Sequence, residues 1–464
     1  MSLSLEETRL LTRLYTKWQR QRPTDEKNER YYEARQKIEQ LGISIPPEVE
    51  PFAFPMDWCR QAVETIEQRM EVQRIIRSGE IREDTELRAD WEVNNLDLEA
   101  QLAHRDLLVY GRCVATVSWP ERELGQTRPV IRVESPRAIA VEVNPLTRMM
   151  TGALRVYADE TGLTQHLTLY LPNETIHLTQ EVGRWVLGQH GRRRHDLGRV
   201  PVVVQYNRRK TGTWEGESQM AGIMPWVDMA GRVVLNLQLG METVATPQKV
   251  AQGLTKADFI DPETGEELDP WDTYLGAIWA ISASKKDGVS IEQLPAGDLK
   301  GFIDVMEMIT KQVAASSGLP LRMLGHSTVN PASEGGIKAD EAKLIRITER
   351  VSSTAGVFWG WVMGISERIR TGTWPDGSTI RLEWRNAATP TMAEMSDAIQ
   401  KQTGGAPVLS VKGAMQDMGW SQPRIDQELA WLDQERTGYY VETDKKLERE
   451  FQPPPDDDPK AWNG

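Results

Sequence analysis

The acidic residues best spaced to hold a metal ion alternate around Gly265; they are Asp261, Glu263, Glu267 and Asp269. Carboxylates at alternate positions with a glycine between them are typical of a calcium-binding loop. Here the glycine comes one position early and Pro262 interrupts the pattern, so a hairpin turn is the favoured interpretation. A divalent-metal nuclease built on these carboxylates remains open as an alternative function.

The sequence lacks the short motifs of the common catalytic classes. It contains no GxxxxGK[ST] of P-loop ATPases, no HExxH of zinc proteases and no GxSxG of serine hydrolases, and its six histidines show no ligand spacing. The two cysteines, Cys59 and Cys113, lie far apart and outside any CxxC motif, which argues against a zinc site or a disulfide framework. We therefore expect a protein that is not an enzyme and that needs no cofactor and no metal.

Basic residues are dense at only two places, residues 192–195 and residues 208–210. Solvated loops are the favoured interpretation of both clusters, and contact with DNA or an acidic partner is the alternative. The net charge of −13 argues against tight general binding to DNA, because phosphate affinity comes chiefly from clustered lysine and arginine.

A length of 464 residues predicts about three domains. The most apolar run, residues 233–245, is short and contains Asn236, Gln238 and Glu242, whereas a membrane span needs about 20 apolar residues. The first 20 residues alternate charged and apolar side chains without the continuous apolar region of a signal peptide. We expect an intracellular product without a membrane segment.

The elements with the strongest patterns lie between residues 298 and 370, where two amphipathic helices flank a polar loop. In the first helix the apolar residues with helical spacing are Phe302, Val305, Met306, Ile309 and Val313, and Gly318 with Pro320 predicts its end. In the second they are Leu344, Ile347, Val351, Ala355, Phe358, Val362, Ile365 and Ile369, from a start near Ile337 to an end at Gly372. Residues 321–336 form the loop.

Three glycines, Gly356, Gly360 and Gly364, lie four residues apart on the second helix. Each costs about 1 kcal/mol relative to alanine inside a helix, so the spacing indicates either the close approach of another backbone or a bend. Trp359 and Trp361 on the same helix are interpreted first as core or subunit-interface residues.

A further helix is predicted over residues 217–244, with one face made of Met220, Ile223, Val227, Val234, Leu237, Met241 and Val244. A helix that is apolar over most of its surface needs neighbours on several sides. In a monomer this means a core helix, and in a ring it means packing between subunits. Turn motifs at 261–265 and 286–288 bracket the apolar residues 274–281, which predicts a small β-containing module over 246–297, between this helix and the next.

The remaining segments predict a mixed α+β fold that is mainly helical. Helices are expected over residues 1–40, 57–77 and 96–110, and alternating runs from Cys113 to Gln205 predict a β-meander. A strand over 379–384 could return to that sheet. Three helices are expected over 392–402, 408–418 and 423–434, followed by a proline-rich acidic tail that predicts disorder.

A set of short motifs, in a fixed order, resembles the portal proteins of tailed bacteriophages of the siphophage type. The densest is Gly318-Leu-Pro, Leu324-Gly and the run from Asn330-Pro-Ala-Ser-Glu-Gly-Gly336 to Arg350. The others are Tyr31-Tyr32 with Leu41-Gly-Ile-Ser-Ile-Pro-Pro47, His104 to Gly111, Glu134-Ser-Pro136, His195 to Pro201, and Gly216-Glu-Ser218. One such motif would be weak, whereas the ordered set is specific.

The resemblance implies the portal architecture. It places a wing over 1–215, to which 371–390 return, stem helices over 216–245 and 298–319, and a clip over 246–297. It further implies a tunnel loop over 320–336, a long kinked helix over 337–370 with the kink at the three glycines, a helical crown over 391–450 and a disordered tail over 451–464.

The resemblance also implies a structural role as a ring, typically of twelve copies, at one capsid vertex of the virion, assembled in the host cytoplasm. Double-stranded DNA would pass through the ring independently of sequence. The implied partners are the terminase large subunit, head-tail adaptors, and the major capsid and scaffolding proteins. Tunnel-loop contacts to DNA are predicted for Arg322, His326, Thr328, Asn330, Ser333 and Lys338. Packing between neighbouring stems is predicted for Val227, Val234, Leu237, Met241, Val305 and Ile309.

Two other functions stay open from the sequence. One is the metal-dependent nuclease named above, and the other is a phage structural adaptor that forms no ring. Solution mass and electron microscopy separate a ring from either of them.

Overall fold

The computed structural model describes residues 3–36, 56–80, 82–159, 162, 165–181, 184–245, 249–252, 290–293, 299–325, 334–375, 380–388, 392–404, 407–420 and 422–450. The chain divides into two compact units, Met1–Ala387 and Ala388–Gly464, which are described separately. The predictions made for residues 41–47, for the turns of the 246–297 module and for the tail after 450 lie outside the described residues. Within those ranges, no helix has the length and apolar character that crossing a bilayer requires.

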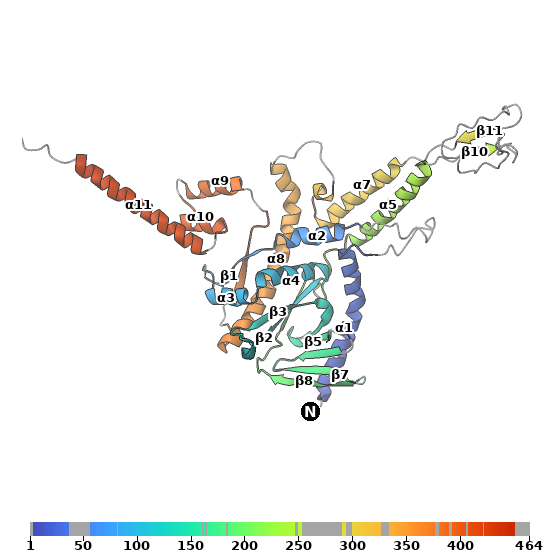
Figure 1. Cartoon of the computed structure of the whole chain (residues 1–464), viewed down its shortest axis with the longest axis horizontal. Helices are drawn as coiled ribbons and strands as arrows, with labels where there is room; N and C mark the ends of the chain where they lie inside the picture. Colours follow the sequence, from blue (N-terminus) through green and yellow to red (C-terminus); the bar gives the residue numbers. More distant parts are fainter. Residues whose placement is uncertain are drawn as a thin grey trace, which may run out of the picture. The chain divides into compact units, whose positions relative to one another are not determined.

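The first unit begins with α1 (Leu5–Tyr32), whose start is fixed by a capping box between Ser4 and Glu7. This helix packs on a five-stranded antiparallel sheet through Leu11 and Leu14. The strands, in spatial order, are β4 (Ile139–Val143), β5 (Met150–Ala158), β6 (Gln165–Tyr170), β7 (Glu174–Glu181) and β8 (Arg184–Arg194). They form the meander that the alternating sequence predicts, with α1 beside it in Figure 1.

A second sheet has three strands, in the order β3 (Val130–Glu134), β2 (Arg112–Ser118) and β9 (Val202–Tyr206). The single meander predicted from Cys113 to Gln205 is therefore two sheets. The last strand, β9, pairs with β2, as in the register Val114 opposite Val204, instead of extending the meander. Alternation specifies that a segment is a strand, but the partner is chosen by contacts between residues far apart in sequence.

The helix predicted over residues 57–77 is wrong in its second half. The segment forms α2 (Trp58–Glu67) and then β1 (Val72–Arg77), which pairs antiparallel with β12 (Ile380–Trp384). Ile75 lies opposite Leu382 in this pair, and both side chains are buried. The strand expected near residue 380 is thus present, and its partner is β1, a segment that precedes both larger sheets in the chain.

The main core of this unit lies where α3 (Thr85–Val93), α4 (Leu96–Val109) and the long helix α8 (Glu334–Thr371) meet. Trp91 of α3 and Trp359 of α8 are fully buried, with ring centroids 5.0 Å apart in an edge-to-face arrangement. Two short 3-10 helices, η2 (Arg122–Leu124) and η3 (Pro136–Ala138), connect strands.

A helical hairpin follows β9 in the chain. It consists of α5 (Met224–Ala245) and α7 (Lys300–Ser317), which pack against each other in Figure 1. Between them in sequence lie β10 (Lys249–Gln252) and β11 (Ser290–Gln293), which pair antiparallel. A 3-10 turn, η6 (Leu321–Leu324), then leads toward α8.

The second unit contains three helices, α9 (Met392–Thr403), α10 (Val411–Asp417) and α11 (Gln422–Glu450). The three predicted helices are confirmed, and the last is much longer than expected. Ser410 caps α10 by accepting a hydrogen bond from the backbone N–H of Gly413 at 3.1 Å.

Candidate channel and assembly site

The α5–α7 hairpin buries one apolar stripe and exposes another. Leu235 of α5 and Val313 of α7 are fully buried in the described part of the chain. Gly240 lets the two helices come close, since a Cβ there would lie 3.0 Å from the Leu299 Cδ2 atom. Ile303 and Met308 of α7 are exposed, as is Met241 of α5, whose exposed fraction is 48%. The outside of the hairpin therefore carries apolar side chains whose burial against a partner would lower the free energy.

The predicted stem residues divide into two groups. Val227 and Ile309 lie fully buried in the core of the chain itself, so their predicted packing against a neighbouring subunit is wrong. The reason is that both belong to the main core cluster, where residues of α2, α4 and α8 of the same chain surround them. Val234, Leu237 and Val305 are partly exposed and Met241 is exposed, so they stay predictions for a subunit contact.

The elbow between α7 and α8 depends on Gly318. Its φ of +82° is the left-handed conformation that glycine adopts most readily, and its N–H donates to the Ala314 oxygen at 2.9 Å. A Cβ at this position would lie 2.5 Å from Ile347 Cδ1 of α8. Gly318 therefore both ends α7, as predicted, and allows α8 to pack against that end.

The residues on both sides of the polar loop are held by polar contacts. Glu341 of α8 pairs with Arg322 of η6 and with Arg69, the latter at 3.1 Å. Lys343 donates to the Ala315 oxygen at the end of α7, and Gln61 of α2 donates to the Met323 oxygen. The residues on both sides of 326–333 are therefore held in place by these contacts. We call these contacts the framework.

This framework places only part of the predicted loop site. Arg322 pairs with Glu341 while its side chain stays partly exposed, so its contact with DNA stays a prediction. His326, Thr328, Asn330 and Ser333 lie outside the described residues, as does the side chain of Lys338, whose backbone lies in the first turns of α8. Their contact with DNA stays a prediction.

The three spaced glycines face β12 and the segment before it. A Cβ on Gly360 would lie 2.8 Å from the Ile380 backbone oxygen, and one on Gly356 would lie 3.4 Å from Trp384 Nε1. Of the two explanations that the sequence left open, the close approach of another backbone is confirmed at Gly360. Residues 334–371 form one continuous helix, and a bend within it stays a prediction.

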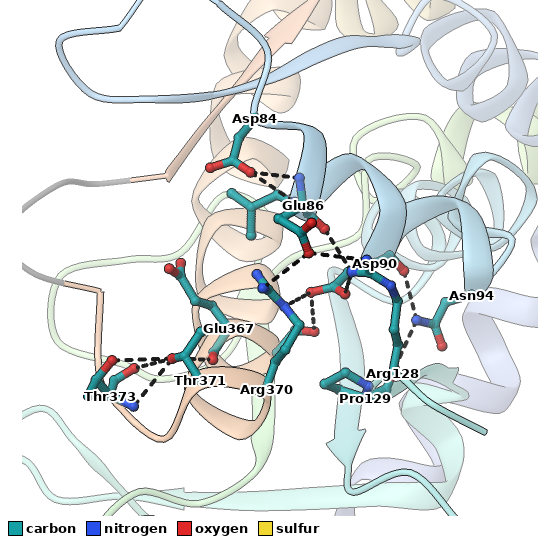
Figure 2. A network of polar contacts seen from close by, with 12 residues as sticks. Asp84, Glu86, Asp90, Asn94, Arg128, Pro129, Glu367, Arg370, Thr371 and Thr373 are labelled. Carbon is teal, nitrogen blue, oxygen red and sulfur yellow. Dashed lines mark hydrogen bonds and ion pairs between the residues drawn. The ribbon is translucent and has the colours of Figure 1, made fainter.

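A buried carboxylate, Asp90 of α3, ties the C-terminal end of α8 to α3 and to Arg128 (Figure 2). Its oxygens accept hydrogen bonds from Arg128 Nη1 at 2.6 Å, from Ser366 Oγ at 3.1 Å and from Arg370 Nε at 3.3 Å. Glu86 pairs with the same two arginines. Sequence reasoning missed this cluster because its members come from positions near 90, 128 and 370, and no local spacing connects them.

Burial also sets the protonation of several groups. It lowers the pKa of His104 to about 3, and the neutral ring accepts a hydrogen bond from Trp359 Nε1 at 3.0 Å. Burial raises the pKa of Cys59 to about 12 and that of Cys113 well above its ordinary value, so both thiols are inert.

The basic cluster at residues 192–195 is partly engaged inside the fold. Hydrogen bonds from Arg192, together with its charge, lower the pKa of Glu7 to about 2, and Arg192 also pairs with Glu174 at 3.1 Å. For Arg192 the favoured interpretation, a solvated loop, is therefore wrong, because it lies in β8 and faces α1.

The described part of the chain contains no group of three or more His, Cys, Asp or Glu residues arranged to hold a metal ion. The carboxylates at 261–269 lie outside it. The described residues provide a long helix with polar contacts near both ends, flanking residues of 326–333 that are held by ion pairs, and a hairpin with exposed apolar side chains.

Comparison with known proteins identifies the family. Residues 11–438 match the family model described as "Phage portal protein, SPP1 Gp6-like". The portal protein of Mycobacterium phage D29 is 33% identical over 419 residues, covering 88% of this chain and 85% of that one. The portal protein of Mycobacterium phage L5 is 34% identical over 419 residues, which also cover 88% of this chain and 85% of that one.

Among solved structures, similar chains come from the neck of an empty gene transfer agent particle and from the virion of a native one. Both have TM-scores of 0.48, with 13% and 12% identity. They cover 85% of this chain, and 93% and 99% of their own lengths. The match of the family model to most of the sequence, together with the two relatives, places this chain in the SPP1 Gp6-like family of phage portal proteins.

Proposed function

We propose that copies of this chain assemble into a ring at one capsid vertex, through which double-stranded DNA enters during packaging and leaves during ejection. Family membership and the uncovered apolar side of the α5–α7 hairpin support this proposal. A ring supplies the neighbour that Met241 and Ile303 lack within a single copy, and twelve copies is the number that the family resemblance implies.

The role of the chain in this process is passive. The terminase large subunit supplies the ATP-driven motor from the clip end, and head-tail adaptors later occupy the same end, while capsid and scaffolding proteins surround the wing. Residues 326–333 contact the duplex through sequence-blind interactions with phosphate. The paired anchors around Glu341 support this role, because they hold both ends of the loop while its centre follows the DNA.

The observation that carries the proposal is the exposed apolar outside of the hairpin, and substitution there tests it. Leu237→Asp and Met241→Asp place a charge where the ring would exclude water, so we expect soluble single chains in place of rings. Leu146→Asp is the matched control, because Leu146 lies in the β4–β5 turn and is 88% exposed. Negative-stain imaging and native mass spectrometry read the result.

Rings that persist in both hairpin variants contradict the packing, and wild-type protein that stays a single chain at all concentrations contradicts the ring itself. The channel role has a separate test. Deleting residues 328–333 should leave rings intact and lower the DNA content of particles, and particles with normal genomes would remove the loop from the mechanism.

A further inference from the structure

A groove of about 1230 Å³ runs along the outer face of α8, beside β12 and the segment that precedes β9. Its floor is the line of glycines that includes Gly356 and Gly360, and its walls carry Val357 and Trp361. Val357 is 53% exposed and Trp361 is 44% exposed, which is unusual for large apolar side chains around one hollow. The groove is therefore an exposed apolar surface, of the kind that marks a site of interaction with a partner.

Arg199 stands over this apolar surface. Its guanidinium carbon lies 3.7 Å from the centroid of the Trp361 ring, a cation–π contact, and burial lowers the pKa of the group. No carboxylate in the described ranges pairs with it. A partly desolvated guanidinium of this kind is stabilised by an incoming carboxylate, because charge-assisted hydrogen bonds are the strong ones.

Exposed apolar side chains also project from α4. Leu98 and Leu102 lie one turn apart on the same helix face, and both are exposed, Leu98 by 67%. Glu99 stands next to Leu98, and no cation among the residues that the structure describes pairs with it. We call Leu98, Glu99 and Leu102 the ridge, which presents two apolar side chains and one unpaired carboxylate.

The ridge and the groove face away from each other within one copy. His104, on the inner face of α4, accepts the hydrogen bond from Trp359 of α8. Val357 and Trp361 are each two residues from Trp359, which is about 200° around the helix. The two surfaces therefore cannot meet in a single chain, and in the part of the chain that the structure describes both are left exposed.

We propose that the ridge of one copy docks in the groove of the next copy, with Glu99 facing Arg199 and the leucines against Val357 and Trp361. Two different patches meet in such a contact, so it is heterologous, the kind of contact that forms a ring when the rotation between neighbouring copies closes. This inference rests on the proposed ring and names a wing contact that sets the order of its subunits. Apolar exposure and opposite charge both support a second copy as the occupant.

Thiol cross-linking tests the contact. A chain with Leu98→Cys and Val357→Cys places one thiol on the ridge and one in the groove, and the native Cys59 and Cys113 are fully buried and do not compete. With a short bis-maleimide linker we expect a ladder of covalent oligomers up to the full ring. The Leu5→Cys, Val357→Cys chain is the matched control, because Leu5 is 68% exposed and no residue of α1 lines the groove, and we expect no ladder from it.

Single-cysteine chains establish the polarity. Leu98→Cys alone and Val357→Cys alone should stay uncross-linked, and mixed rings of the two should give covalent dimers and nothing longer. Dimers from either single variant mean that like surfaces meet, which overturns the proposal. If the double-cysteine chains form rings by imaging but give no ladder, the ridge–groove contact is overturned and the proposed ring is not. If wild-type chains form no ring, both the contact and the ring are overturned.

A charge exchange gives a second measurement. Arg199→Glu should reduce the yield of the ladder in the double-cysteine chain several-fold, because two carboxylates then face each other. Adding Glu99→Arg should restore it, since the pair is rebuilt with reversed signs. A ladder of unchanged yield in the Arg199→Glu chain contradicts the assigned pairing.

Discussion

Replacing Asp90 by alanine should destabilise the first unit by about 3 kcal/mol, because it removes one carboxylate from a buried charged cluster. Asp90 is fully buried and accepts from Arg128, Ser366 and Arg370. Breaking a buried pair typically costs about 3–5 kcal/mol, since an uncompensated charge is left behind. Both arginines keep some contact with water and with Glu86, which places the cost at the lower end of that range.

Two effects account for most of this decrease in the free energy of unfolding. The Ser366 hydroxyl is fully buried and would lose its acceptor, which costs about 1–3 kcal/mol. The two guanidinium groups would then repel each other across a cavity of aspartate size. Asp90→Asn keeps the volume and one acceptor oxygen, so we expect it to lose less stability than Asp90→Ala.

Urea unfolding followed by tryptophan fluorescence measures the effect, because Trp91 lies in the same helix and is fully buried. Lys311→Ala is the control, since Lys311 forms an exposed ion pair with Glu307 at 2.7 Å, a kind of pair worth about 0–1 kcal/mol. The reasoning is refuted if Asp90→Ala lowers the free energy of unfolding no more than Lys311→Ala does.

Two other changes test the packing and the protonation of α8. Gly360→Ala should destabilise by about 1–3 kcal/mol because its Cβ would meet the Ile380 oxygen, whereas Gly301→Ala, in open space on α7, should be neutral or stabilising, and urea unfolding of both variants compares them. The pKa of His104 is about 3 when folded and about 6.5 when unfolded, so the unfolded chain alone takes up this proton between those values. The contribution of His104 to the free energy of unfolding is therefore fully present above about pH 6.5. It decreases as the pH falls, and the loss is about 2 kcal/mol at pH 5. His104→Gln should therefore lose less stability than wild type between pH 7 and pH 5, and equal losses would contradict the buried neutral ring.

Local sequence patterns predicted much of the element order. The apolar spacing from Leu344 to Ile369 is confirmed as one long helix, and Gly318 is confirmed as the end of α7. The strands from β2 to β9 follow the alternating runs. The ordered short motifs also pointed to the correct family, whose model matches residues 11–438.

Contacts between distant segments could not be predicted in this way. The strand at Val72–Arg77 was predicted as a helix, since its identity depends on pairing with Ile380–Trp384 more than 300 residues later. The ion pair of Arg322 with Glu341 was not predicted, because the two side chains come together only once η6 and α8 meet. The burial of Val227 and Ile309 was missed for the same reason.

The sequence by itself determined the family, the helical periodicities and the stops that bound them, because these depend on residues within one or two turns of each other. Tertiary structure alone decided which apolar faces the chain covers with its own side chains and which it leaves bare, and which charges pair across hundreds of residues. Burial and pairing depend on distances in space, and those exist only after α3, α8 and β12 have packed together.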